Sequence, residues 1–290
     1  MFVELVHVTT ADGLRLDGAL RSVPEDAAQR PLAVDAFIWV HGTGSNFYGS
    51  SLGEAFSQRL VELGAACLLI NTRGHDLMST ASTVGGGRRA GAAYERIEDC
   101  RHDVTAWVDF LANRGLRRVG LVGHSLGAVK CIYALAHESR LPVVALVAVS
   151  PPRLSHALFA NGAKRDEFLA AYEQADRLVR AGRTQELIES TFPLPYALAA
   201  EAYLDKYGPH ERYNVLSLLP RVTIPTLVTF GSVEVVDNLA FQDMPKEIER
   251  LAADRAVEVA MVAGADHFYA GARDELIARV EAWLRRTLPV

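Results

Sequence analysis

The residues with the clearest chemical potential occupy positions 123–127, where the sequence is G-H-S-L-G. This motif follows an apolar run over residues 118–122 and precedes a helical pattern over residues 126–137. A sharp turn from a strand into a helix crowds the backbone, so glycines are needed two residues either side of the serine. Such a turn lifts the serine hydroxyl to the N-terminus of the helix, and the motif therefore predicts Ser125 as a nucleophile.

A serine hydroxyl is a weak nucleophile and needs a base beside it. Among the nine histidines, His267 lies just after the last predicted strand and just before the last predicted helix. That position places it at the same sheet edge as Ser125, so we expect it to be the base. His41, His75 and His124 lie near the same edge. His124 adjoins the serine in sequence and cannot easily face its hydroxyl, so a packing role is expected there.

The base in turn needs a carboxylate to orient it. Glu234 is the third residue after Gly231, the glycine that follows the predicted strand 226–230, and Asp237 stands three residues further on. We favour Glu234 as this acid and keep Asp237 as the alternative. Asp266 adjoins His267, and a neighbour in sequence usually cannot reach round to the ring. The resulting chain order is serine, acid, histidine.

An oxyanion formed during acyl transfer needs backbone N–H donors. One donor is expected from the amide of Leu126, at the start of the helix that follows Ser125, where the helix dipole also helps. A second is expected from the glycine-rich loop after the predicted strand 32–40, with the amide of Thr43 favoured and that of Gly44 as the alternative.

Short apolar runs alternate with helical patterns along most of the chain, which predicts a parallel sheet covered by helices on both faces. The buried strands are expected at 32–40, 65–71, 118–123, 143–149, 226–230 and 257–262, after an antiparallel hairpin formed by 1–10 and 14–21. The helices are expected at 52–63, 95–113, 128–137, 242–252 and 274–286.

One stretch, residues 153–218, breaks this alternation. It contains no convincing strand but carries amphipathic helical patterns such as residues 165–181. We therefore expect a core formed by residues 1–152 and 219–290, with 153–218 inserted as a helical cap. Ligands bind at the carboxyl ends of the strands in open α/β sheets, and the cap is expected to cover that edge.

Four further side chains are weaker candidates for contacts with a substrate. Arg88 and Arg89 lie on a long loop, 78–94, and either could bind a carboxylate, although two solvated arginines are the simpler interpretation. Phe47 and Phe268 adjoin the glycine-rich loop and the predicted base.

Tyrosines of the inserted stretch could also line an aromatic substrate pocket. We name Tyr196 and Tyr203 as the candidates, while packing of the insertion onto the core is the simpler interpretation for these residues.

Composition excludes several classes of function. The 290 residues are 50% hydrophobic and 22% charged, and 35 acidic against 30 basic residues leave a formal charge of −5. This balance gives no basic footprint for nucleic acid. The longest apolar run, 141–149, is too short for a membrane span, and residues 1–10 do not resemble a signal peptide. The three scattered cysteines suggest no metal site and fit a reducing, cytoplasmic compartment.

Taken together, these motifs resemble the α/β-hydrolase superfamily over nearly the whole chain. The residues that carry the resemblance are Val40-His41-Gly42, Asn71-Thr72-Arg73-Gly74-His75, Gly123 to Gly127, Ile224 to Leu227, Gly231 to Glu234, and Gly264 to His267. The resemblance implies an eight-stranded, mostly parallel sheet with a cap inserted after the sixth strand. Aspartate is commoner than glutamate at the position of Glu234, which keeps Asp237 open as the acid.

The expected activity is hydrolysis of a carboxylic ester of a small molecule through an acyl-enzyme, with no cofactor; amides and thioesters rank below esters. A C–C bond hydrolase or an acyltransferase could use the same three residues. A non-catalytic ligand-binding protein on this fold is the alternative from another class. Ser125 excludes the members that carry aspartate at this turn, the haloalkane dehalogenases and epoxide hydrolases. The fold itself does not select a substrate.

Overall fold

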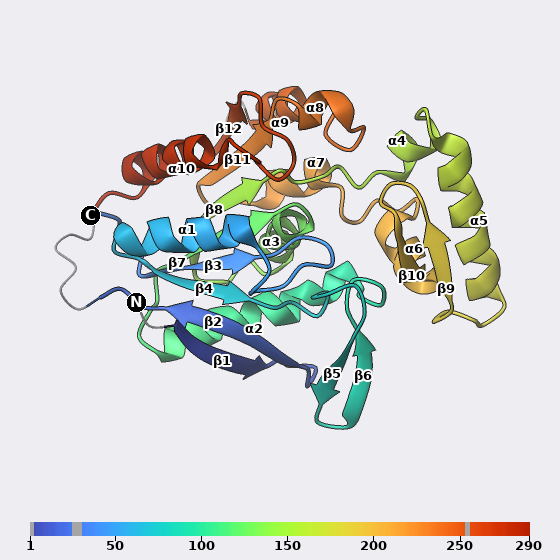
Figure 1. The fold of residues 1–290 in the computed structure, drawn as a ribbon, viewed down its shortest axis with the longest axis horizontal. Helices are drawn as coiled ribbons and strands as arrows, with labels where there is room; N and C mark the ends of the chain where they lie inside the picture. Colours follow the sequence, from blue (N-terminus) through green and yellow to red (C-terminus); the bar gives the residue numbers. More distant parts are fainter. Residues whose placement is uncertain (1–2, 25–30, 253–255) are drawn as a thin grey trace.

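The computed structural model describes residues 3–24, 31–252 and 256–290. Its centre is a sheet of eight strands in the order β1-β2-β4-β3-β7-β8-β11-β12 (Figure 1). β2 runs in the opposite direction to the other strands of this sheet, so its pairs with β1 and β4 are antiparallel and the remaining pairs are parallel. The predicted fold class is therefore confirmed. The strands are β1 (Val3–Thr9), β2 (Arg15–Arg21), β3 (Ala36–Val40), β4 (Ala66–Ile70), β7 (Val119–His124), β8 (Val143–Val149), β11 (Thr226–Gly231) and β12 (Val257–Val262).

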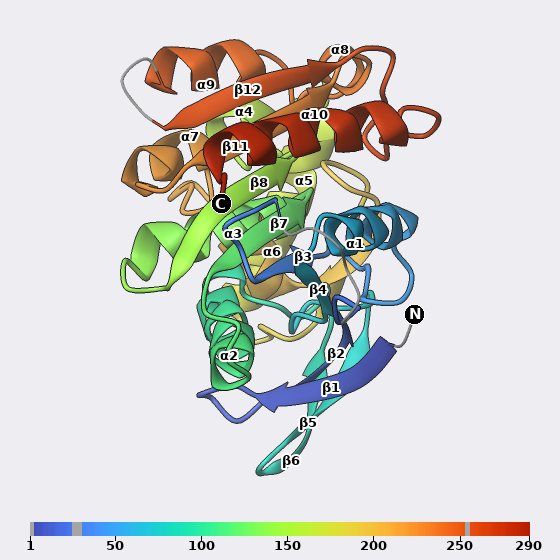
Figure 2. The same cartoon turned by 90° about the vertical axis from the view of Figure 1, so that its left-hand side faces the viewer.

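Helices cover both faces of the sheet. Successive side chains of a strand point to opposite sides, so each central strand packs against both helical layers. On β3, Ile38 packs in the cluster that includes α2 (Cys100–Asn113) and α3 (Leu126–His137). Its neighbour Trp39 packs with α1 (Ser51–Glu62) and α10 (Arg273–Thr287). Figure 2 shows these two pairs of helices on opposite sides of the sheet. Burial on both faces explains why the central strands are continuous apolar runs in the sequence.

The predicted long loop over residues 78–94 contains regular structure instead. β5 (Ser79–Thr83) and β6 (Gly86–Ala90) form an antiparallel hairpin. β5 consists of serine, threonine and alanine, the turn is Val84-Gly85, and Gly86 at the start of β6 has a φ of 116°, which favours glycine. The prediction of an irregular loop was therefore wrong. A short 3₁₀ turn, η1 (Ile97–Asp99), follows and leads into α2.

The stretch 153–218, called the insertion below, lies between β8 and β11 in the chain. It contains α4 (His156–Ala160), α5 (Arg165–Arg180), β9 (Leu187–Ser190), β10 (Tyr196–Ala199), α6 (Ala200–Tyr207) and α7 (Val215–Leu218), with η2 (Leu219–Arg221) after it. The expectation that it holds no strand was wrong, because β9 and β10 pair antiparallel. Each has only four residues, too few to show a clear alternation. Figure 1 shows α4, α5, α6, β9 and β10 of the insertion beyond the ends toward which β3 and β4 point, whereas α7 lies beside α3.

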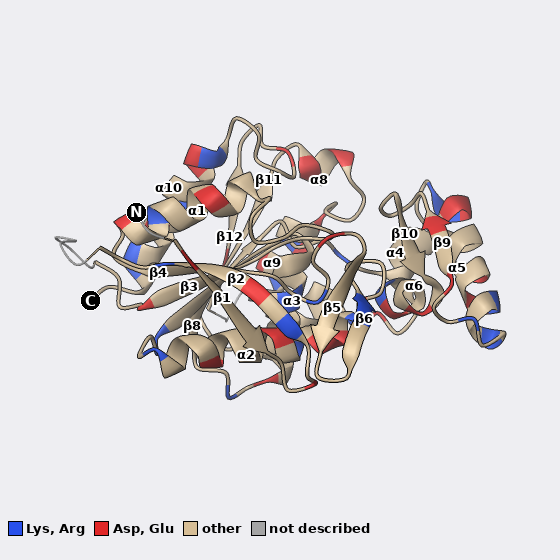
Figure 3. Cartoon of the chain, turned by 60° about the horizontal axis from the view of Figure 1, so that its bottom comes forward, with Lys and Arg blue, Asp and Glu red and all other residues tan. Residues whose placement is uncertain are grey.

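Charged residues of both signs are interspersed over the surface helices (Figure 3). Helix α5 carries Asp166 and Glu167 in its first turn and Arg177 and Arg180 in its last, an arrangement that complements the helix dipole. Within the described ranges, no helix combines the length and the apolar character that a membrane crossing demands.

The remaining two helices follow β11 and lead into the last strand. α8 (Glu234–Asp237) begins three residues after Gly231, and α9 (Met244–Ala252) packs against β12. The loops after β3, β7, β8, β11 and β12 meet at the carboxyl edge of the sheet. That edge carries the predicted reactive residues.

Candidate active site

Ser125 sits at the junction of β7 and α3 with a φ of 56°, a left-handed conformation that is rare for serine. Its amide donates to the carbonyl of Val149, 2.8 Å away, which ties the turn to the neighbouring strand. Glycine is needed at positions 123 and 127 because neither position has room for a Cβ atom. A Cβ on Gly127 would lie 2.2 Å from the Val40 oxygen, and one on Gly123 would lie 2.6 Å from the Gly127 oxygen. The motif thus encodes a strained turn that aims the serine hydroxyl outward.

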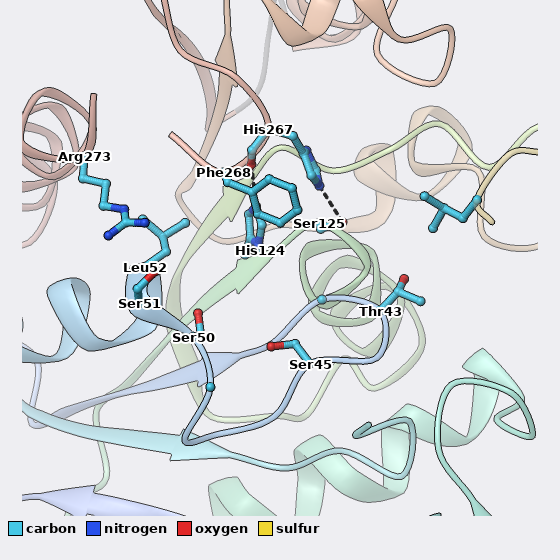
Figure 4. A pocket seen from close by; sticks show the side chains of 13 residues that line it. Thr43, Ser45, Ser50, Ser51, Leu52, His124, Ser125, His267, Phe268 and Arg273 are labelled. Atoms are coloured by element: carbon cyan, nitrogen blue, oxygen red, sulfur yellow. Dashed lines mark hydrogen bonds between the residues drawn. The ribbon is translucent and has the colours of Figure 1, made fainter. Parts of the chain in front are cut away.

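His267 links the serine to a carboxylate. Its Nε2 lies 3.0 Å from Ser125 Oγ, and its Nδ1 lies 2.8 Å from Glu234 Oε2. The carboxylate accepts the Nδ1 proton, which leaves the Nε2 lone pair facing the serine hydroxyl. Figure 4 shows the contact between His267 and Ser125 at the wall of a pocket. The structure therefore brings together three residues that come from separate loops of the chain.

Glu234, rather than Asp237, faces the histidine. Glu234 is the first residue of α8 and is buried, with 4% of its surface exposed. Its second oxygen, Oε1, accepts the Gly231 amide at 2.7 Å and the Ser150 hydroxyl at 2.5 Å. Asp237 lies exposed at the far end of the same helix turn. Asp266 Oδ1 accepts the amides of Phe268 and Ala270 and so turns back into its own loop.

Two residues that were missed in the sequence support this carboxylate, Ser150 directly and Tyr269 through its contact with Ser150. The Ser150 hydroxyl lies 2.9 Å from the Tyr269 hydroxyl, which lies 3.2 Å from Thr229 Oγ1. Burial raises the pKa of Tyr269, so its hydroxyl remains protonated. Ser150 directly follows β8, whose neighbours β7 and β11 carry Ser125 and Glu234. This position at the carboxyl edge of the sheet was the signal that could have identified Ser150 in the sequence.

The ring of His124 supports His267 from below, as the expected packing role implies. His124 Nε2 donates to the His267 carbonyl at 2.8 Å, and the two ring centroids are 4.9 Å apart. The rings of Trp39 and Phe268 also lie against His124, with centroids 6.4 and 6.1 Å away. Burial, together with the positive charge of His267 when protonated, lowers the pKa of His124 to about 3. His124 is therefore neutral near pH 7.

The loop after β3 brings a peptide group close to the serine. His41 Nδ1 donates to the Gly42 carbonyl at 2.8 Å, while its Nε2 accepts the Thr72 amide at 3.1 Å. Burial and the nearby Lys130 charge lower the pKa of His41 to about 3, so these two roles are fixed. The Gly42 carbonyl belongs to the same planar peptide unit as the Thr43 amide, whose direction is thereby set.

Both predicted oxyanion donors border Ser125. Thr43 lines the same pocket as the serine, and its amide has no hydrogen-bond partner in the described part of the chain. Leu126 is the first residue of α3, where backbone amides lack partners within the helix. Gly44, the alternative, adopts a φ of 63° and packs toward Leu77.

The pocket has a volume of about 240 Å³. This is below the roughly 300–1,000 Å³ typical of sites for drug-sized ligands. Beside the reactive residues, its lining includes the hydroxyl side chains of Thr43, Ser45, Ser50 and Ser51, the apolar Leu52, Leu194 and Phe268, and Arg273. Among these, only Thr43 and Phe268 were predicted from the sequence as site residues. The rest come from segments that only the tertiary packing brings together.

Among the weaker predicted substrate contacts of the core, Phe268 lines this pocket and is 64% exposed, whereas Phe47, Arg88 and Arg89 do not line it. Phe47 instead packs against the apolar cluster that contains Trp39, and its amide donates to Asn71. Arg88 and Arg89 are exposed on β6. Arg88 lies 3.9 Å from Asp12, and Arg89 lies over the ring of Tyr94.

The two tyrosines of the insertion are used for packing. Tyr203 is fully buried and directs its hydroxyl to the Phe168 carbonyl, 3.4 Å away. Tyr196 accepts a hydrogen bond from Lys206 Nζ at 2.9 Å. Neither lines the pocket that contains Ser125. In the ranges that the structure describes, no group of three or more His, Cys, Asp and Glu side chains has the arrangement of a metal site.

Solved structures with the same fold include several hydrolases. The chain is similar to the α/β hydrolase GrgF from Penicillium sp. sh18, at 16% identity and a TM-score of 0.71, with 99% of each chain covered. The esterase Pf2001 from Pyrococcus furiosus is 18% identical, with a TM-score of 0.66 over 99% of this chain and 92% of that one. Est1E from Butyrivibrio proteoclasticus with bound ferulic acid is 16% identical, with a TM-score of 0.65 over 97% and 99%.

None of the curated proteins compared with this chain matches it. A family model does: the one described as the alpha/beta hydrolase family matches residues 37–280. That range begins in β3 and ends inside α10, so it spans the motif of Ser125 and the loops of Glu234 and His267. The chain therefore belongs to the alpha/beta hydrolase family.

Proposed function

We propose that this hydrolase cleaves a carboxylic ester of a small molecule through an acyl-enzyme on Ser125. The observation that carries the proposal is the chain of hydrogen bonds from Ser125 through His267 to Glu234, at 3.0 and 2.8 Å, in the wall of a pocket. The esterases among the similar structures support the choice of an ester ahead of an amide or a thioester.

In the first half of the reaction, Ser125 Oγ attacks the ester carbonyl as its proton passes to His267 Nε2. The negative charge that forms on the carbonyl oxygen is stabilised by the amides of Leu126 and Thr43. His267 then gives its proton to the departing alkoxide, which leaves as the alcohol. The acyl group remains bonded to Ser125.

In the second half, a water molecule gives a proton to His267 Nε2 and attacks the acyl-enzyme. Collapse of this intermediate returns the proton to Ser125 and releases the carboxylic acid. Throughout, Glu234 accepts the Nδ1 proton of His267 and stabilises the imidazolium form. The buried hydrogen bonds from Gly231 and Ser150 keep the carboxylate in place.

Residues 1–152 and 219–290 act in this proposal as the catalytic core, and the insertion acts as a cap. Leu194, which lies between β9 and β10, is the residue of the insertion that lines the pocket. A cap of this kind excludes water and shapes specificity. The small pocket volume supports substrates with short acyl or alcohol arms.

The test is Ser125→Ala assayed with 4-nitrophenyl acetate. We expect kcat to fall by about 10⁴- to 10⁶-fold, because the nucleophile is lost. Ser51→Ala, which removes a hydroxyl from the same pocket, is the matched control and keeps most of the activity. More than a tenth of the wild-type rate in Ser125→Ala would contradict the proposal. Binding without turnover by the wild type would instead favour a non-catalytic ligand-binding protein.

A further inference from the structure

Arg273 lines the pocket without an electrostatic partner. It is the first residue of α10 and is partly buried. In the described part of the chain, no acidic side chain pairs with its guanidinium, and its buried Nε has no hydrogen-bond partner. Buried polar groups such as this Nε are almost always satisfied in folded proteins. The unpaired charge therefore points to a partner that enters the pocket.

The surroundings of Arg273 suit an anion. The described lining contains no aspartate, glutamate or lysine, so the arginine sets the charge of the pocket wall. Hydroxyl groups of Ser50 and Ser51 belong to the same lining. Ser50 Oγ accepts the Gly53 amide at 3.0 Å, which leaves its own proton available to a second acceptor.

The charge also lies apart from the reacting atoms. Figure 4 shows Arg273 reaching from α10 toward Leu52 and Ser51, on the opposite side of the pocket from Thr43. His124 and Phe268 lie between Arg273 and Ser125 in this view. An anion bound at Arg273 would thus belong to a remote part of a substrate whose ester carbonyl lies at Ser125.

We infer that Arg273 is a specificity-determining residue that binds a carboxylate at the far end of the substrate. The substrate class is an ester that also carries a free carboxylate, such as a half-ester of a short dicarboxylic acid or an acylated hydroxy acid. A guanidinium pairs with a carboxylate through two parallel hydrogen bonds. A single arginine matches a monoanion better than the double charge of a phosphate monoester. The inference rests on the proposed function.

The experiment compares matched charged and neutral esters. One series contains the monomethyl esters of succinic, glutaric and adipic acid, set against methyl butanoate, pentanoate and hexanoate. A second contains O-acetyl hydroxy acids, set against the corresponding alkyl acetates. Release of methanol or acetic acid gives kcat/KM for each substrate. We expect the wild type to prefer the charged member in at least one series.

Arg273→Met keeps the length of the side chain and removes its charge. We expect kcat/KM for the preferred charged esters to fall by about 10- to 100-fold, as expected for a lost charge-assisted pair. The neutral esters should change by less than about threefold, and Arg273→Lys should restore part of the lost preference. Arg279→Met removes the same charge from the exposed face of α10 and should change neither class.

Two results would overturn the inference: no preference for charged esters in either wild-type series, or an equal loss for charged and neutral esters in Arg273→Met. The wild-type comparison decides the matter even if Arg273→Met fails to fold. Calorimetric binding of monomethyl glutarate to Ser125→Ala, with and without Arg273→Met, separates the two proposals. If the wild type hydrolyses no ester but Arg273→Met weakens binding in the Ser125→Ala background, the carboxylate site is supported and only the esterase is rejected.

Discussion

Glu234 is held by more partners than any other group of the reactive chain. Its two oxygens accept from His267, Gly231 and Ser150, all within 2.8 Å. A carboxylate fixed in this way sets both the tautomer and the orientation of the imidazole. The geometry therefore favours Glu234, the first residue of α8, over Asp237 as the proposed acid.

Glu234→Gln should lower kcat for 4-nitrophenyl acetate by about 10³- to 10⁴-fold, because the amide disfavours the required tautomer. Asp237→Asn is the matched control in the same helical turn and should keep activity within about twofold of the wild type, since its side chain is exposed. Steady-state kinetics of both variants check the ranking. The reverse order would assign the role to Asp237.

The proximity of Ser125 and His267 could be predicted because the local sequence around each has a recognisable pattern. The strained turn of Ser125 demands glycines at fixed spacing, and His267 follows the last strand of a regular alternation. Arg273 and Leu194 carry no such mark. Arg273 reaches the pocket through the packing of α10 against α1, elements more than 200 positions apart in the chain. Leu194 depends on a hairpin of two four-residue strands.

At the scale of elements, a buried ionic cluster joins the insertion to the core. Glu95, which precedes η1, lies 2.6 Å from Lys130 of α3 and 3.6 Å from Lys206 of α6. All three side chains are almost fully buried. Burial opposes ionisation of Glu95, but the two lysines lower its pKa below the ordinary value. Lys130 Nζ also donates to Thr72 Oγ1, and the backbone amide of Thr72 donates to His41 Nε2.

Glu95→Gln should destabilise the protein by about 3–5 kcal/mol, because it leaves two lysines buried without a counter-charge. The free energy of unfolding from urea titration measures this loss. Glu62→Gln removes an exposed carboxylate paired with Arg59 and should change stability by less than about 1 kcal/mol. Equal effects of the two substitutions would show that the buried cluster adds nothing to stability.

Leu194 provides the test of the insertion as a cap. Leu194→Ala should enlarge the pocket and raise kcat/KM for hexanoate relative to acetate esters of 4-nitrophenol by several-fold, since the longer acyl arm gains room. Tyr203→Phe removes a hydroxyl inside the insertion and should leave this ratio unchanged. The ratio across a series of acyl lengths is the measurement. A uniform loss over the whole series would make the insertion a structural element only.

At the scale of the whole molecule, the alternation of apolar runs and helical patterns was sufficient to predict the main sheet. Its central strands are buried on both faces, which leaves little freedom in their sequence. The two extra hairpins, β5–β6 and β9–β10, were missed. They lie outside the main sheet, where short strands carry no continuous apolar signal. In the sequence, each hairpin appears only as a stretch where the alternation of apolar runs and helical patterns is interrupted.

Two buried neutral histidines link stability to pH. The pKa values of His41 and His124 are lowered to about 3 in the folded protein, against about 6.5 in an unfolded chain. Between these values the unfolded state binds more protons, so stability falls as the pH drops below about 6.5 and is fully present above it. Each histidine contributes a slope of up to about 1.4 kcal/mol per pH unit.

His124→Gln should therefore flatten the dependence of the unfolding free energy on pH between 4 and 7, even though it lowers stability at pH 7. Urea titrations at several pH values measure this slope. His7→Gln, on the exposed face of β1, is the control and should leave the slope unchanged. An unaltered slope in His124→Gln would mean that this histidine takes up a proton in the folded state.

The central claim is that Ser125 becomes covalently acylated, and a fluorophosphonate probe tests it most directly. Such a probe reacts with a serine activated by a neighbouring base and mimics the first half of the reaction. Mass spectrometry of the labelled protein should show one adduct on the peptide that contains Ser125, together with loss of esterase activity. Ser125→Ala should carry no adduct. An adduct that persists in Ser125→Ala, or ester hydrolysis by protein that is fully labelled at Ser125, would contradict the account.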